Sequence, residues 1–188
     1  MITSRQEYRQ YVKADIAAYG LTHVSLYNYL RIDQLRFQLR LRRLEYLTNC
    51  CRWRFLSRAV LEVMNHHLAV RLGVTVPKNV FGPGLCLVHR GTVVVSPLAH
   101  VGANCRLHPS TSIGDYNGAP TLGDNVYIGP GAKLYGPITI GSNVAIGANA
   151  VVNSSFPDNC TVGGIPARVL SNTGAIEQGV FPNTRTNG

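Results

Sequence analysis

Four features that would assign a chain to a class at once are missing from this sequence. No apolar run approaches the roughly 20 residues that a membrane-spanning helix needs, and residues 1–10 are too polar for a secretory signal peptide. Neither a Walker phosphate loop nor a dinucleotide-binding fingerprint occurs, because Gly82, Pro83 and Gly84 do not link a strand to a helix. We therefore expect a cytoplasmic protein without a membrane span.

The cysteines fit neither a disulfide framework nor a zinc site. Their number is odd, and their spacing matches neither kind of module. Cys105 falls at an inward position of the repeat described below, where a thiol acts as a small hydrophobic side chain. We interpret all five as reduced thiols and expect no bound metal: Cys50, Cys51, Cys86, Cys105 and Cys160.

Acidic residues are scarce, with 9 Asp/Glu against 18 Lys/Arg and a formal net charge of +9. The excess lies mainly in residues 1–71, which hold twelve Lys/Arg and five Asp/Glu. A basic surface suits nucleic acid, an anionic membrane or a phosphorylated substrate, but it also suits a solvated or subunit-facing helical surface. We expect no nucleic acid partner and keep peripheral membrane contact through the basic helices as an alternative.

An aliphatic residue returns at every sixth position through most of residues 93–152, usually with Gly directly behind it. These anchors are Val95, Val101, Leu107, Ile113, Leu122, Ile128, Leu134, Ile140, Ile146 and Val152. A small or β-branched residue stands two positions before most anchors: Ala99, Cys105, Thr111, Val126, Ala132, Ile138, Val144 and Ala150. A period of six fits neither a helix nor an ordinary strand. It predicts a coil of short strands, a β-solenoid.

Three six-residue units close one triangular turn of such a coil, so residues about 18 apart should stack. The repeat breaks at residues 115–121, a segment rich in turn formers and too long for a corner. We expect this segment to leave the wall as a loop. Loops on repeat scaffolds often carry function, and a merely solvated insertion is the alternative.

The chain before the repeat predicts a small helical region. Ser4 and Glu7 form a capping box that opens a first helix, and Gly20 ends it. Residues 25–47 predict a second helix, although their leucines alternate as in a strand. Residues 51–72 predict a third helix with a heptad-like stripe of Leu56, Val60, Val63 and His67.

These elements divide the chain into three parts. Residues 1–73 form the helical region, which Gly73 ends, and residues 74–170 form the solenoid. Residues 171–188 lose all periodicity and are predicted to be a loose tail.

Four stretches of the repeat region resemble the hexapeptide-repeat acyltransferases, and within them the serine O-acetyltransferase group. They are residues 84–95 (GLCLVHRGTVVV), 99–105 (AHVGANC), 125–133 (NVYIGPGAK) and 164–168 (GIPAR). The resemblance implies a mostly β fold, a left-handed parallel β-helix preceded by a small α-helical region. It also implies acetyl-CoA as co-substrate and a homotrimer with active sites between subunits, with a dimer of trimers as a further option.

Acetyl transfer from a thioester to a hydroxyl needs a base that takes the hydroxyl proton, and imidazole suits this role. The resemblance places the base at His89. His108 precedes the displaced loop and is a candidate for binding the acceptor. The remaining histidines are interpreted as surface or packing residues: His23, His66, His67 and His100.

Several positions depart from the serine acetyltransferase pattern. The family's Asp before the catalytic His is Val88 here, and its Asp that orients the base aligns with Val74. The Arg-His pair that holds the serine carboxylate aligns with Gly118 and Ala119. Because the base motif is kept while the amino-acid pocket is lost, we expect a sugar or surface-polysaccharide precursor as acceptor. A divergent serine O-acetyltransferase of cysteine biosynthesis is the alternative.

Without its usual partner, His89 needs another carboxylate to orient it. Asp15, Asp33 and Asp115 are candidates for this role or for binding sugar hydroxyls. Arg90, directly after His89, is a further candidate for binding the acceptor.

The resemblance places coenzyme A in the groove between neighbouring solenoids. Backbone groups near Gly114, Pro130 and Ala148 would line the pantetheine arm, because small corner residues allow close approach. Arg168 and Lys133 would bind the phosphates. An ordinary exposed corner residue is the alternative for Lys133.

The same scaffold is compatible with two other classes of function. A γ-type carbonic anhydrase needs three histidines that converge on zinc, and His89, His100 and His108 lack the required spacing. A non-catalytic solenoid would serve as a structural or binding module. Retention on a coenzyme A column would argue against that module.

Overall fold

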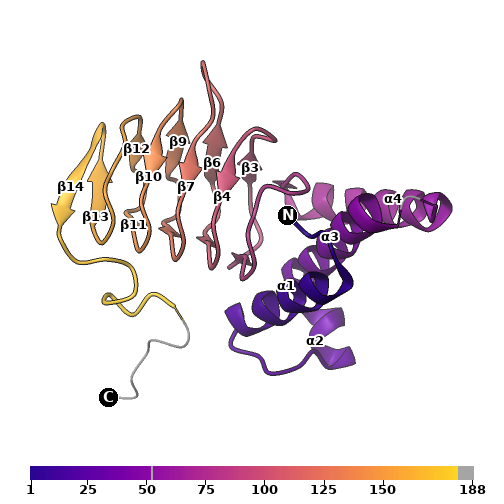
Figure 1. Cartoon of the computed structure of the whole chain (residues 1–188). Helices are drawn as coiled ribbons and strands as arrows, with labels where there is room; N and C mark the ends of the chain where they lie inside the picture. The colour runs from indigo at the N-terminus through magenta and orange to yellow at the C-terminus, as the bar shows by residue number, and fades with distance from the viewer. Residues whose placement is uncertain (52, 182–188) are drawn as a thin grey trace.

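The computed structural model describes residues 1–51 and 53–181, in which a helical region stands beside one end of a β-solenoid (Figure 1). The helices are α1 (Arg5–Ala18), α2 (Leu26–Arg31), α3 (Asp33–Cys50) and α4 (Phe55–Leu72). This order confirms the predicted fold class, a helical region followed by a parallel β-solenoid. Within the described residues, no helix combines the length and hydrophobicity needed to cross a bilayer.

Helix α1 begins at the predicted cap. The Ser4 side chain accepts the backbone N–H of Glu7 (3.1 Å). The Glu7 carboxylate accepts the backbone N–H of Thr3 (2.6 Å), one residue earlier than a capping box requires. Beyond the helix, Gly20 adopts a φ of 73°, the left-handed conformation that glycine takes at little cost.

The predicted single helix over residues 25–47 is two helices. Helix α2 is capped by the Ser25 side chain, which accepts the N–H of Asn28 (3.1 Å). The backbone then bends at Ile32, with φ −96° and ψ 85°. This break places Asp33 in the first turn of α3, where the helix dipole favours a negative charge.

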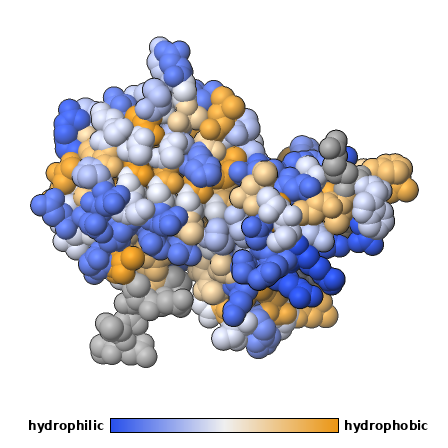
Figure 2. Space-filling model, in the orientation of Figure 1, coloured by the Kyte–Doolittle hydropathy of each residue, from blue (hydrophilic) through white to orange (hydrophobic). Residues whose placement is uncertain are grey.

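Helix α4 starts at Phe55, four residues later than predicted, and Gly73 ends it with a φ of 75°. Its heptad-spaced stripe faces solvent, since Leu56, Val60 and Val63 are 68%, 61% and 57% exposed. Figure 2 shows hydrophobic surface at the α4 end of the molecule. The buried side of the helix carries different residues: Asn65, Leu68 and Leu72.

Three sheets form the solenoid, and successive turns of the coil add strands to them. The five-stranded sheet contains β1 (Val74–Thr75), β3 (Val93–Val95), β6 (Thr111–Gly114), β9 (Lys133–Tyr135) and β12 (Val151–Val152). The three-stranded sheet contains β4 (His100–Val101), β7 (Thr121–Leu122) and β10 (Thr139–Ile140). The six-stranded sheet contains β2 (Cys86–Leu87), β5 (Arg106–Leu107), β8 (Tyr127–Ile128), β11 (Ala145–Ile146), β13 (Thr161–Gly164) and β14 (Ala167–Ser171).

The aliphatic anchors of the repeat fill the interior of the coil, as predicted. All of them are buried, and so are the small or β-branched residues two positions earlier. Residues 18 apart stack in register, as Ala145 does on Tyr127 and Val151 on Lys133. Each fully buried aliphatic side chain contributes about 1.5–3 kcal/mol, so the column of anchors is the main source of stability.

The predicted loop leaves the wall between β6 and β7. Val93 pairs with Thr111, 18 residues on, whereas Ser112 pairs with Lys133, 21 residues on. Residues 115–118 are exposed, and the loop projects beyond the other corners (Figure 1). The extra residues therefore form a protrusion and leave the coil above and below in register.

Asparagines in the left-handed conformation mark the corners that precede the six-stranded sheet. The four residues are Asn104, Asn125, Asn143 and Asn159, with φ of 56–57°. The Asn104 amide donates to Asn125 and the Asn143 amide donates to Asn159, both at 2.9 Å. Asparagine is one of the few residues that adopt this conformation readily.

The C-terminal segment is not a loose tail over residues 171–181, while residues 182–188 lie outside the described part. Strand β14 pairs antiparallel with β13. The chain then returns along the solenoid, where the Asn143 side chain donates to Glu177 and accepts the N–H of Ile176 (2.8 Å). Side-chain hydrogen bonds hold this segment, so the loss of apolar periodicity could not reveal it.

The helices close the other end of the solenoid with polar side chains. Strand β2 lies at the edge of the six-stranded sheet. Gln38 of α3 donates to the carbonyl of Leu85 (2.6 Å) and accepts the N–H of Leu87 (2.9 Å). The Tyr19 hydroxyl donates to the Leu87 carbonyl (2.9 Å). These bonds replace those that a preceding turn of the coil would make.

Candidate active site

Three aromatic rings cluster along the six-stranded sheet. The rings of His89 and His108 lie 6.2 Å apart between centroids, and those of His108 and Tyr127 lie 5.0 Å apart. The three residues come from successive turns of the coil, next to β2, next to β5 and in β8. The structure thus brings together the two histidines singled out from the sequence and adds Tyr127, which sequence reasoning missed.

The register of the coil fixes this cluster. The N–H of Val88 donates to the carbonyl of Leu107 (3.0 Å), and the N–H of His108 donates to the carbonyl of Ile128 (3.2 Å). These backbone bonds fix the positions of Val88, next to His89, and of His108 relative to the following turn of the coil. Regular backbone bonding makes the separation of the rings a property of the scaffold.

The environment of His108 keeps its imidazole neutral. Burial lowers the pKa of His108, and electrostatic interaction with Arg106 and His89 lowers it further. Its Nε2 atom is buried and has no hydrogen-bond partner among the described residues. Burial also raises the pKa of Tyr127, so its hydroxyl stays protonated. The pair offers hydrogen-bonding groups beside the exposed His89.

Asp15 does not orient His89 as predicted. Its carboxylate is fully buried and bonds to the Arg42 guanidinium at 2.8 and 3.2 Å. The same carboxylate accepts the N–H groups of Gly84 and Leu85 (2.8 and 3.0 Å). Its acceptor sites are thus used at the seam between helices and solenoid, where its role is structural.

Arg42 is the centre of that seam. It donates to Asp15, to Glu45 (3.0 Å) and to the carbonyls of Phe81 and Gly82 (2.9 and 2.6 Å). Burial by itself would lower the pKa of Arg42, but the carboxylates of Asp15 and Glu45 outweigh it and raise that pKa. The guanidinium is therefore permanently charged and fully satisfied.

Asp33 forms an ion pair with Arg90, the residue after His89. Its carboxylate lies 2.8 Å from Nη2 of Arg90 and 3.5 Å from Nη2 of Arg71, and it also pairs with Arg36. The predicted contact with His89 is replaced by this cluster of arginines. Asp33 therefore positions Arg90, the residue next to His89.

Asp115 lies at a different corner of the coil from His89. His89 stands between β2 and β3, whereas Asp115 stands in the exposed loop between β6 and β7. A single chain therefore does not bring the two together. Only a neighbouring copy, as in the predicted homotrimer, would place this loop beside His89.

Most of the predicted donor-binding residues share the corner of His89. The N–H of Gly131 donates to the carbonyl of Pro109 (3.0 Å), and the N–H of Asn149 donates to the carbonyl of Pro130 (2.8 Å). Pro130 and Ala148 therefore lie at the same corner in later turns, and these stacked corners form a column. Lys133 donates to the Ser110 carbonyl beside it.

Two predicted donor residues lie away from this column. Gly114 ends β6, at the corner that opens the projecting loop. Arg168 lies in β14 at the C-terminal end of the solenoid, where its guanidinium donates to the carbonyl of Ala167 (2.8 Å).

Arg106 is a second residue that sequence reasoning missed. Its side chain projects outward from β5, between Cys86 of β2 and Tyr127 of β8 in the sheet register. Outward positions of a repeat carry no periodic constraint, so their residues give no signal in the pattern. The one available clue is charge. Arg106 is the charged residue among the outward positions that pair across the parallel strands of this sheet, which are Cys86, Arg106, Tyr127, Ala145 and Thr161.

Comparisons with known proteins agree with this architecture. The family model "Bacterial transferase hexapeptide (six repeats)" matches residues 119–154. Serine acetyltransferase of Synechococcus elongatus is 37% identical over 119 residues, which cover 60% of this chain and 49% of that protein. Serine acetyltransferase of Mycobacterium tuberculosis is 34% identical over 134 residues, which cover 68% of this chain and 57% of that protein. The matches span about half the length of these curated relatives.

Solved structures extend the similarity to the helical region. Neisseria gonorrhoeae serine acetyltransferase in complex with serine has a TM-score of 0.70 at 26% identity, covering 89% of this chain and 71% of that one. The soybean apoenzyme has a TM-score of 0.67 at 25% identity, covering 88% and 69%. This chain therefore carries the hexapeptide repeat of bacterial transferases, and its similarity points to the serine acetyltransferases.

Proposed function

We propose that this chain is an acetyl-CoA-dependent O-acetyltransferase with His89 as general base. The observation that carries the proposal is the cluster of His89, His108 and Tyr127 on a hexapeptide-repeat solenoid. The described residues hold no group of three or more His, Cys, Asp or Glu placed to bind a metal ion. The similarity to serine acetyltransferases supports acetyl-CoA as the co-substrate.

In the proposed reaction, His89 takes the proton of the acceptor hydroxyl while that oxygen attacks the thioester carbonyl carbon. The carbon–sulfur bond then breaks, and the imidazolium returns the proton to the leaving thiolate. The products are an acetyl ester and free coenzyme A. Neutral His108 and protonated Tyr127 supply hydrogen bonds to the acceptor or to the developing oxyanion.

The donor runs along the corner column that ends at His89. Pro130 and Ala148 lie along this column, and Lys133 stands beside it, so the pantetheine arm would pass over them. Arg168 lies at the far end of the solenoid, as a phosphate contact on an extended donor would. Gly114 and Asp115 would join from a neighbouring copy in a homotrimer.

Two acceptors are compatible with this site. Serine is the first, because the relatives and solved structures are serine acetyltransferases and one of them is in complex with serine. A sugar hydroxyl is the second, because the uncharged Val88, Gly118 and Ala119 occupy the aligned positions of the amino-acid pocket. The polysaccharide pathway expected from the sequence has no support beyond these three positions.

The proposed base is tested by substituting His89 with Ala. General-base assistance contributes about 10²–10⁴ to rate, so His89→Ala should lower the rate of coenzyme A release by that factor. The KM for acetyl-CoA should stay unchanged, because other residues bind the donor. His100→Ala is the matched control, since His100 is an exposed histidine on the three-stranded sheet.

Turnover of His89→Ala within tenfold of wild type would contradict the role of His89. If His108→Ala abolished turnover while His89→Ala stayed within tenfold of wild type, the base would be His108.

A further inference from the structure

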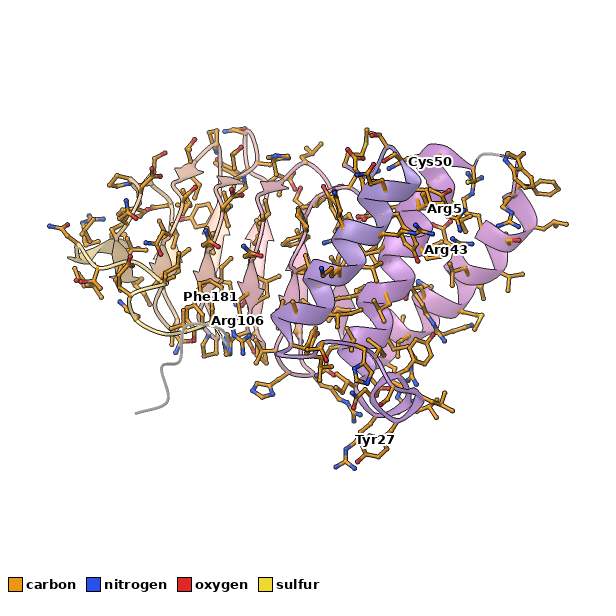
Figure 3. The ribbon with its side chains drawn as sticks, turned by 60° about the horizontal axis from the view of Figure 1, so that its bottom comes forward. Arg5, Tyr27, Arg43, Cys50, Arg106 and Phe181 are labelled. Atoms are coloured by element: carbon orange, nitrogen blue, oxygen red, sulfur yellow. The ribbon has the colours of Figure 1, made fainter. Side chains whose placement is uncertain are left out.

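A cavity of about 350 Å³ opens between α1, the six-stranded sheet and the C-terminal segment. Ala17 and Ala18 of α1 form one side, and Cys86 and Arg106 form another. Ile176 and Phe181 cover it, and Figure 3 shows Phe181 beside Arg106. This volume lies within the range of small-molecule sites, which combine apolar walls with a few polar groups.

Arg106 is weakly bonded within this cavity. Its Nη1 atom lies 3.5 Å from the carbonyl of Ala18, at the limit of hydrogen bonding, and 3.5 Å from Sγ of Cys86, which is a weak acceptor. Among residues 1–51 and 53–181, no carboxylate forms an ion pair with Arg106. A part-buried guanidinium has five donors, which suits an anionic partner.

The groups around Arg106 do not supply that negative charge. Burial raises the pKa of the Cys86 thiol to about 11, so the thiol is neutral. Asp15, the nearest carboxylate of α1, is held by Arg42 and by two backbone N–H groups. The charge of Arg106 is thus available to a ligand.

The position of Arg106 connects the cavity to the candidate active site. Arg106 and His108 point to the same outer side of the wall, two residues apart, which is about 7 Å along a strand. The His108 ring in turn faces His89 at 6.2 Å. A small molecule that binds Arg106 through its acid group and extends past His108 would present a hydroxyl to His89.

We infer that Arg106 binds the acid group of the acceptor and so selects a hydroxyl compound that carries a carboxylate or a phosphate. The inference rests on the proposed acetyl transfer. Serine and acidic or phosphorylated sugars share this chemistry, whereas neutral sugars lack it. Arg106 would then replace the carboxylate-binding pair that is absent at Gly118 and Ala119.

Pairs of acceptors that differ only in the acid group test this inference. L-serine is compared with L-serinamide, and glucose 6-phosphate with glucose, by the rate of coenzyme A release from acetyl-CoA. In wild type, the acidic member of one pair should have the higher kcat/KM, and that pair identifies the acceptor as amino acid or sugar. Arg106→Gln should lower kcat/KM for this member about 10- to 100-fold by raising its KM. The KM for acetyl-CoA and the rate with the neutral member should stay unchanged.

Two variants control for a merely structural role. Arg106→Lys keeps the charge and should recover most of the lost preference. Arg5→Gln removes a cation from the start of α1, far from Arg106 (Figure 3), and should change neither KM. Equal losses for both members of a pair, or a rise only in the KM for acetyl-CoA, would overturn the inference. Equal losses accompanied by a lower melting temperature would show that Arg106 only braces α1.

Failure of the proposed function would be visible separately. Wild type would then release no coenzyme A with any acceptor. Calorimetric titration with glucose 6-phosphate and L-serine would still measure binding to the cavity. Binding lost in Arg106→Gln would support the anion site without catalysis, and the absence of binding in wild type would overturn it.

Discussion

The interior of the solenoid and its seam with the helices are both buried, but they are built from opposite kinds of residue. The interior is apolar and repeats every turn. The seam holds buried polar side chains: Asp15, Gln38, Arg42 and Glu45. The difference follows from hydrogen bonding, because every inner turn bonds to the turn before it, whereas the first turn has none. Side chains must complete its backbone bonds, so buried charge here indicates the end of a repeat.

The strongest test of this comparison is Arg42→Ala. The variant leaves the carboxylates of Asp15 and Glu45 buried without their cation, and two carbonyls without a donor. Breaking a buried ion pair costs about 3–5 kcal/mol, so the free energy of unfolding in urea should fall by that amount. The neighbouring Arg43 stacks on Tyr8 and Tyr46 at the surface, so Arg43→Ala should cost less than about 1 kcal/mol. Equal costs would mean that the seam is not held by charge.

A smaller effect tests the uniformity of the interior. Ile128 and Ile146 are fully buried anchors that stack directly in β8 and β11. Ile128→Val and Ile146→Val should each lower the free energy of unfolding by about 0.5–1.5 kcal/mol, and by similar amounts. Urea denaturation of both variants measures this. A difference of more than about 1 kcal/mol between them would show that the turns are not equivalent.

The interior could be predicted from the sequence because geometry repeats there. An anchor every sixth residue has one explanation, a coil, and the structure buries every anchor. The loop at residues 115–121 was predictable for the same reason, since an interruption stands out against a period. The Ser4 cap is a local signal and needs no tertiary information.

The seam and the candidate site could not be predicted because their residues obey no period. Asp15 lies on an amphipathic helix, and only the fold shows that its partners are Arg42 and the backbone of the first turn. Tyr127 and Arg106 occupy outward positions, where a repeat accepts any residue. Their place in the site follows from the strand register, which pairs Arg106 with Tyr127 and sets the Tyr127 ring against His108.

Helix α4 presents a third case, a periodic stripe that the structure leaves uncovered. The spacing of Leu56, Val60 and Val63 predicted a face, yet the described residues of this chain do not cover it. Periodicity thus identifies a surface, and only the fold shows what packs against it.

The smallest expected effect concerns this stripe. Val63 is exposed, and surface substitutions usually change the free energy of unfolding by less than about 0.5 kcal/mol. Val63→Ser should therefore unfold in urea as wild type does. We also expect light scattering to give the mass of a homotrimer for both, because the predicted trimer forms its grooves between neighbouring solenoids. Val70→Ser, on the same exposed side of the helix, should behave alike. A fall in mass, or a loss of stability that depends on protein concentration, would instead make the stripe a contact between subunits, since only a second chain could then be covering it.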